Sequence, residues 1–247
     1  MVISVVGETK RGTVFKIPLS DAVSFGDNTY IHFVTKEEKE ARKKGEEVEF
    51  NEIKGLELTF DVDVTEDAEV ELIIDKETGH ALKGRGIGGL LVEINTNDKF
   101  NMWGDFAVFE GVYNFAFGGL VQKEFIVQPG GTIAWEGEPS KPKIDMLATY
   151  KTQTNPSPLL DNPINRSIPV ELNISLNGDL EQLDPNFSFE FPNVNSTIKS
   201  ELNYRLESQD ERDTQALFLV STGSFSSGFN DLNASGTIAE RLNGIIN

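Results

Sequence analysis

The sequence contains no cysteine, and it has only two histidines and two tryptophans among 247 residues. Without cysteine the chain forms no disulfide and performs no thiol chemistry, although this leaves its compartment open. Positive charge is also scarce, because 22 Lys and Arg stand against 40 Asp and Glu, which gives a formal net charge of −18. Such a charge repels nucleic-acid phosphates, so we expect no nucleic-acid partner.

Long hydrophobic runs are missing as well. No stretch approaches the roughly 20 apolar residues that span a bilayer, and the opening MVISVVGETKRG lacks the charged lead of a secretory signal. Catalytic signatures are equally scarce: no GxSxG elbow occurs, and His32 and His80 lack the spacing of metal ligands. We therefore expect no catalytic residues, no metal and no cofactor.

The pattern that is present is alternation of apolar and polar residues, which is typical of strands with one buried face. In LELTFDVDV (56 to 64) every second residue is apolar, and the residues between are Glu, Thr or Asp. The same alternation recurs in AEVELIID (68 to 75), LLVEIN (90 to 95), KIDMLATY (143 to 150), IPVELNISL (168 to 176) and FSFEF (187 to 191).

Short turn signals separate these runs and predict an antiparallel meander. They lie at 75–79, 95–98, 118–119, 129–131 and 177–178. A sandwich, a closed barrel or a long sheet curled along its length would each satisfy this pattern.

The segment GDFAVFEGVYNFAFGGL (104 to 120) differs because it is apolar on both faces. Such a strand is either covered on both sides or lines a cavity. Its glycines indicate sharp curvature, since they remove side chains where a sheet bends. We expect Trp103 and Trp135 to wall the same apolar interior.

Two patterns suggest chemistry but have simpler interpretations. The GRGIGG segment (84 to 89) matches GxGxxG, yet a strand follows it where a dinucleotide site needs a helix, so we interpret it as a turn. Asp61 and Asp63 share a polar strand face, which favours a solvated surface over a catalytic pair. Glu110 would be a candidate general acid if it were buried among the aromatic residues.

Two segments break the β pattern. Residues 36–49 are charged all round, which predicts a solvated helix or loop. From Ser196 the apolar spacing becomes helical. Asp210 with Asp213 indicates the start of a second helix, and the spacing of 238–245 indicates a third. We thus expect N-terminal strands with an insertion (1–55), a β region (56–195) and a C-terminal helical segment (196–247).

Taken together, the segments 102–115, 118–139 and 142–152 resemble the C-terminal domain of the TamB family, the translocation and assembly module subunit of diderm bacteria. Its recurring lines are G-x-Y-x-F, F-x-V-x-x-G-x-I-x-W-x-G-x-P and P-x-I-D-x-x-A. The matching residues are Gly111, Tyr113, Phe115, Phe125, Val127, Gly130, Ile133, Trp135, Gly137, Pro139, Ile144, Asp145 and Ala148. VELNISLNGDLEQLDPNFSFEFP (170 to 192) and DERDTQALFLVSTGSF (210 to 225) resemble later family elements, so the resemblance runs from about Leu56 to Phe229.

The resemblance implies a mainly β fold, in which an elongated antiparallel sheet curls lengthwise into an open, taco-like hydrophobic groove, followed by C-terminal helices. It implies a periplasmic location in a longer protein with an inner-membrane anchor. It also implies phospholipid or acyl-chain transport along the groove and support of outer-membrane protein assembly with an Omp85-family barrel. We expect the docking region for this barrel to be truncated here.

We expect the groove to be lined by alternating apolar residues of these strands. They are Leu72, Ile74, Val92, Ile94, Phe106, Val108, Tyr113, Phe115, Phe117, Ile133, Trp135, Ile144, Met146, Val170, Leu172 and Ile174. An alternative is a chaperone-like interaction module that binds outer-membrane protein strands or the barrel by β-augmentation.

Overall fold

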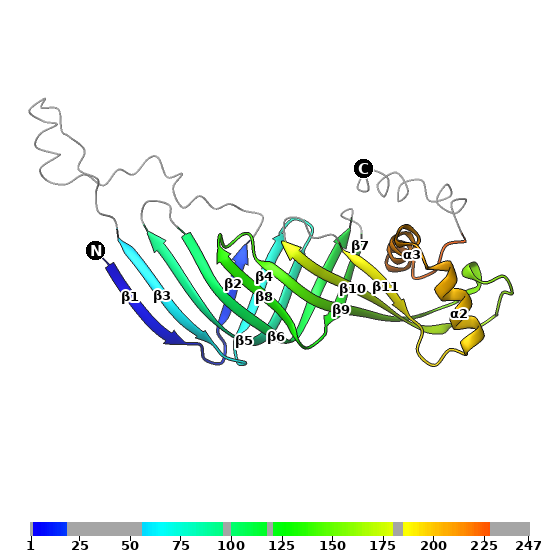
Figure 1. The fold of residues 1–247 in the computed structure, drawn as a ribbon, viewed down its shortest axis with the longest axis horizontal. Helices are drawn as coiled ribbons and strands as arrows, with labels where there is room; N and C mark the ends of the chain where they lie inside the picture. The colour runs from blue at the N-terminus through cyan, green and yellow to red at the C-terminus, as the bar shows by residue number, and fades with distance from the viewer. Residues whose placement is uncertain (1, 19–55, 96–99, 118–120, 180–184, 228–247) are drawn as a thin grey trace, which may run out of the picture.

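The computed structural model describes residues 2–18, 56–95, 100–117, 121–179 and 185–227. They form a sheet of eleven strands followed by two helices, which lie at the end of the molecule opposite β1 (Figure 1). The elements are β1 (Val2–Glu8), β2 (Val14–Pro18), β3 (Glu57–Val64), β4 (Glu69–Asp75), β5 (His80–Asn95), β6 (Phe100–Phe117), β7 (Val121–Val127), β8 (Gly131–Gly137), β9 (Lys143–Thr154), the 3-10 turn η1 (Ser157–Leu159), β10 (Ile168–Asp179), β11 (Asn186–Glu190), α2 (Ser196–Arg205) and α3 (Gln209–Thr222).

The strand order is β1-β3-β5-β6-β7-β9-β10-β11, with β2, β4 and β8 attached at the sides of this path. Most neighbours are antiparallel, as the alternating pattern predicts. However, β1 pairs with β3, and β2 with β4, in parallel. The sheet is therefore mixed at its N-terminal end, which short turn signals alone do not indicate.

The long strands β5, β6 and β9 each pair with one strand along one half of their length and with a different strand along the other half. The sheet therefore has two halves, which we call its arms: one contains β3 and β8, and the other contains β4 and β7. The first half of β5 pairs with β4 and its second half with β3, while β6 pairs first with β8 and then with β7. β9 likewise pairs with β8 and then with β7. Apolar side chains from both arms join one core cluster, so the sheet bends where the two arms meet, near the middle of the long strands. We call this bend the fold line.

The GRGIGG segment lies within β5 along this fold line, so the predicted turn is wrong. At Gly86 a Cβ atom would lie 1.9 Å from the carbonyl oxygen of Ala107, and at Gly104 it would lie 1.9 Å from that of Gly89. Glycine is needed at these positions because the backbones of β5 and β6 approach so closely that a side chain would clash with the neighbouring strand.

A β-bulge explains the doubly apolar segment. Gly86 pairs with Val108 and Arg85 with Glu110, which leaves Phe109 without a partner in the ladder. The extra residue reverses the alternation, because each residue of a strand points to the opposite face from the last. Phe106 and Val108 before the bulge, and Tyr113 and Phe115 after it, therefore lie on one buried face.

The remaining boundaries refine the predictions. Asn177 and Gly178 do not form a turn, because β10 continues through Asp179 opposite β9. The helix beginning near Asp210 is present as α3, but its N-cap is Ser208, whose hydroxyl accepts a hydrogen bond from the Glu211 amide at 3.2 Å. The predictions for His32, 36–49 and 238–245 lie outside the described residues.

Candidate functional site: the inner face of the folded sheet

The inner face is the side of the sheet whose alternating apolar residues form the common core. Most of the residues predicted to line a groove lie here and are buried. The buried residues are Leu72, Phe106, Val108, Tyr113, Phe115, Ile133, Trp135, Ile144, Met146, Val170, Leu172 and Ile174. Ile74, Val92 and Ile94 are partly exposed, and the side chain of Phe117 lies outside the described part.

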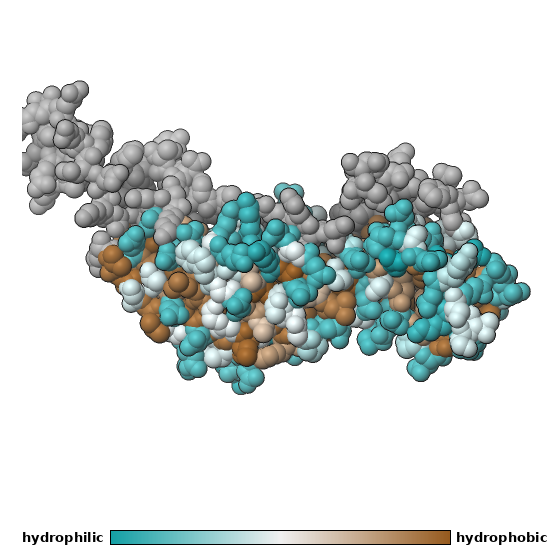
Figure 2. Space-filling view, in the orientation of Figure 1, coloured by the Kyte–Doolittle hydropathy of each residue, from teal (hydrophilic) through white to brown (hydrophobic). Residues whose placement is uncertain are grey.

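Exposure of the inner face is concentrated near its N-terminal end. We call this region the mouth; it comprises Leu58, Phe60 and Val62 of β3, Ile74 of β4, and Val92 and Ile94 of β5, all of them partly exposed. Hydrophobic residues of the outer face are exposed at this end as well, among them Val2, Val6 and Leu91, and Figure 2 shows hydrophobic surface over β1 and β3 at the left end of the molecule. Apolar surface that reaches solvent in this way is typical of a binding or interaction site.

From β6 onward most apolar residues of the inner face are buried, and we call this region the closed part; Phe100, which lies opposite Ile94 at the start of β6, is 36 % exposed and belongs with the mouth. Phe115 of β6 and Phe187 of β11 meet with ring centroids 6.0 Å apart, although β7, β9 and β10 separate their strands in the sheet order. Phe125 contacts Phe115, Tyr113 and Tyr150. The sheet therefore curls far enough at this end for strands that are not neighbours in the sheet order to touch.

One polar pair is enclosed by these aromatic rings. The Nε2 atom of His80 lies 2.5 Å from the hydroxyl of Tyr113, and the His80 ring also contacts Phe115. Burial lowers the pKa of His80, with the charge of Asp75 opposing the shift, and burial raises the pKa of Tyr113. Both groups are thus neutral near pH 7, which fits an apolar environment.

Charge is nearly absent from this face and abundant on the other. Among the described inner positions of β5 to β10, Lys123 is the one charged residue, and its ammonium lies 5.9 Å from the Tyr150 ring centroid. The outer face carries ion pairs such as Lys16–Glu71 and Lys83–Glu69. The arrangement suits an apolar ligand inside and water outside.

α3 covers part of the closed part, whereas α2 packs against η1. α3 packs against β11 and β7, and Phe225 after it contacts Phe189. The Arg212 guanidinium donates to the carbonyl oxygens of Phe187, Leu206 and Glu207 and to Gln209. Arg212 thus joins the edge strand β11 to the end of α2 and the start of α3.

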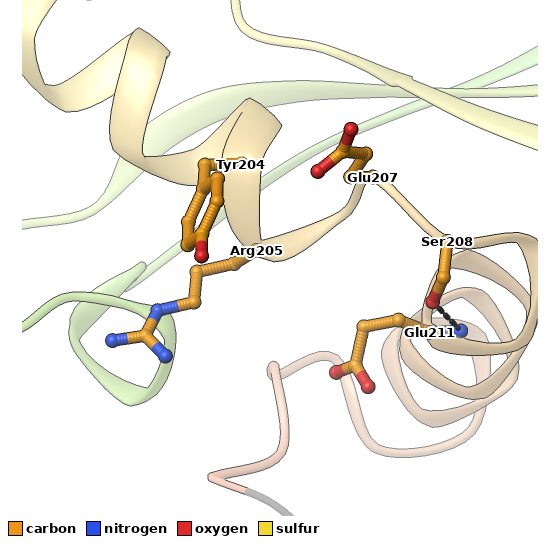
Figure 3. Close-up of a pocket in the computed structure, with 5 residues that line it drawn as sticks. All are labelled: Tyr204, Arg205, Glu207, Ser208 and Glu211. Atoms are coloured by element: carbon orange, nitrogen blue, oxygen red, sulfur yellow. Dashed lines mark hydrogen bonds between the residues drawn. The ribbon is translucent and has the colours of Figure 1, made fainter.

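A surface hollow lies at the junction of α2 and α3 (Figure 3). Tyr204, Arg205, Glu207, Ser208 and Glu211 line it, and Ser208 is engaged in capping α3. Its two carboxylates and its exposed position make it unsuited to an acyl chain.

The alternative sites considered from the sequence are placed at the outer surface. Glu110 is exposed beside Arg85, so the burial that would make it a general acid is missing. Asp61 and Asp63 are exposed on β3, and Trp103 is half-buried on the outer face opposite Leu91, so its expected interior position is wrong. No group of three metal-ligating side chains occurs within the described residues.

Comparison with known proteins decides the family. A family model described as the TamB C-terminal domain matches residues 1–247. The chain belongs to the TamB family. Membership supports a TamB-like role in the translocation and assembly module and in outer-membrane biogenesis, and it places the chain in the cell envelope, among transport and assembly components. A search of curated proteins found no match.

Within this TamB-family domain, no described helix has the length and apolar character required to cross a membrane. The sequence signal that located the inner face was the alternation itself. The signal that it missed was the bulge at Phe109, since nothing in the local residues of β6 marks where the alternation reverses.

Proposed function

We propose that this chain is the periplasmic part of a TamB-like bridge and that phospholipid acyl chains move along its apolar inner face between the inner and outer membranes. The longer protein would be anchored in the inner membrane and would support outer-membrane protein assembly with an Omp85-type barrel. The observation that carries the proposal is the contrast between a nearly uncharged inner face, partly exposed at the mouth, and a charged outer face.

The physical basis is non-directional hydrophobic contact. Each methylene removed from water contributes about 0.8 kcal/mol, so a few suffice to hold an acyl chain. The inner rows at the mouth offer no hydrogen-bonding side chain that would fix the chain in one register. A lipid bound in this way can slide, which is what a conduit requires.

Neighbouring residues of β5 allow a matched test. Val92 lies on the inner face at the mouth, whereas Leu91 lies on the outer face and is 36 % exposed. We expect Val92→Asp to reduce uptake of a fluorescent phospholipid from vesicles by at least about tenfold, because a charge in an apolar contact surface costs more than about 1.4 kcal/mol. Leu91→Asp should leave uptake near the wild-type value.

Thermal unfolding of both variants controls for loss of the fold. Equal uptake by the wild type and a folded Val92→Asp variant would contradict the proposal, as would a wild type that takes up no lipid.

A second candidate function is binding of an extended protein strand, and one observation favours it. Among the described strands, β1 pairs only with β3, and its sequence VISVVGE carries a charge only at its last residue, Glu8. An uncharged strand edge is a template for β-augmentation. Crosslinking from Val6 to barrel precursors, with no capture of lipid, would favour this function over transport.

A further inference from the structure

The two parts of the inner face differ in a way that bears on where a lipid can lie. At the mouth, six apolar residues of β3, β4 and β5 are partly exposed. In the closed part, apolar residues such as Phe125, Val127 and Val170 are at most 2 % exposed. An acyl chain can contact the first group in the described conformation, but it reaches the second only by displacing side chains that already fill the space.

The closed part is also blocked along the length of the molecule. The Phe115–Phe187 contact joins β6 to β11 across the interior. α3 packs over β11 and β7, and hydrogen bonds from Arg212 of α3 connect β11 to the end of α2. The contacts of α3 and Arg212 lie at the helical end of the molecule, which Figure 1 shows at the right, away from β1 and β3. Together, the Phe115–Phe187 contact, the packing of α3 and the hydrogen bonds of Arg212 block the apolar inner face at this end, and we call them the stopper.

We propose that lipid occupies only the mouth and does not pass along the interior beyond the Phe115–Phe187 contact. This inference rests on the proposed transport function. It divides the predicted groove residues into two classes: Ile74, Val92 and Ile94 contact cargo, whereas residues such as Val170, Leu172 and Ile174 are structural core. The physical reason is that the core residues already bury one another, so no apolar surface remains for a ligand.

Single-cysteine variants test the proposal cleanly, because the chain has no cysteine of its own. Valine occurs both at the mouth and in the closed part and is close to cysteine in size, so the fold is retained more readily than with larger changes. We choose Val62→Cys and Val92→Cys at the mouth, and Val127→Cys and Val170→Cys in the closed part. The probe is a phosphatidylcholine whose acyl chain ends in a thiol-reactive group, supplied in phosphatidylcholine vesicles.

We expect capture at Val62→Cys and Val92→Cys to be at least about tenfold faster than at Val127→Cys and Val170→Cys. In denaturant all four thiols should react with a small maleimide at similar rates, which shows that each is competent, and thermal unfolding should show that each variant is folded.

The failures of the two proposals are distinguishable. Capture at Val127→Cys or Val170→Cys as fast as at the mouth, in folded protein, would overturn the present inference and leave transport intact. Capture at none of the four positions would overturn both.

Discussion

At the scale of single residues, the fold line depends on glycines that allow two backbones to approach. A Cβ at Gly86 would lie 1.9 Å from the Ala107 carbonyl oxygen, whereas a Cβ at the nearby Gly89 meets no atom within 4 Å. We expect Gly86→Ala to lower the free energy of unfolding by about 1–3 kcal/mol, the usual cost of an overpacked site.

Gly89→Ala is the matched control for this prediction and should change stability by less than about 0.5 kcal/mol. Urea denaturation of the two variants measures both values. If they were equally stable, the close approach of β5 and β6 would not be what requires glycine at the fold line.

The enclosed His80–Tyr113 pair predicts a dependence of stability on pH. Because burial lowers the pKa of His80 in the folded chain, the unfolded chain binds a proton more readily once the pH falls below about 6.5. Above that value both states are neutral and the residue has no effect. The free energy of unfolding should therefore decrease as the pH falls from about 6.5 toward the lowered folded-state pKa.

The measurement is urea denaturation at about pH 7.5 and about pH 5.5. A His80→Gln variant cannot titrate at this position, so its stability should fall less over the same range. Parallel declines in the wild type and the variant would show that His80 is not responsible.

At the scale of elements, Ser208 and Asp210 are the two residues that could stabilise the start of α3. Ser208 accepts the Glu211 amide, while Asp210 lies in the first turn of the helix. We expect Ser208→Ala to cost about 1 kcal/mol, as the loss of an N-cap does. Asp210→Ala should cost only a few tenths, because it loses a favourable charge near the helix dipole. Chemical denaturation distinguishes the two; the reverse order would assign the cap to Asp210.

One side chain, Arg212, forms hydrogen bonds both to the sheet and to the segment that joins the two helices. Arg212→Met removes the hydrogen bonds that Arg212 donates to the carbonyl oxygen of Phe187 in β11 and to those of Leu206 and Glu207 after α2. We expect amide hydrogen exchange in β11 and α3 to become at least about tenfold faster, while β5 and β6 remain protected.

Arg205→Met is the control, because Arg205 forms an exposed ion pair with Asp161 at the surface of α2. Such pairs contribute little to stability, so exchange in β11 should be unchanged. Faster exchange in both variants would indicate general loosening and not a specific role for Arg212.

At the scale of the whole molecule, apolar side chains of the inner face reach solvent near β3 and are mostly buried near β11. The difference arises from curvature: near β11 the sheet curls until Phe187 meets Phe115, and α3 covers what remains. Near β1 and β3 no described element crosses the inner face in this way. The Val92→Asp and single-cysteine experiments above address the functional meaning of this asymmetry.

Much of this organisation could be predicted from alternation. The polar and apolar sides of β3, β4, β9 and β10 follow directly from their residues, and the helical spacing from Ser196 predicted α2 and α3. The errors share one cause. The GRGIGG and Asn177-Gly178 segments look like turns locally, but they lie in strands because β6 and β9 offer them partners.

The sequence by itself determined that these strands have an apolar side and a charged side, because residue parity fixes which way each side chain points in any extended strand. It also determined the family, through motifs spread over β6 to β9. Only the tertiary structure decided which apolar residues are covered by others. That depends on how far the sheet curls, on the bulge at Phe109 and on where α3 lies, and these are set by contacts between residues distant in the chain.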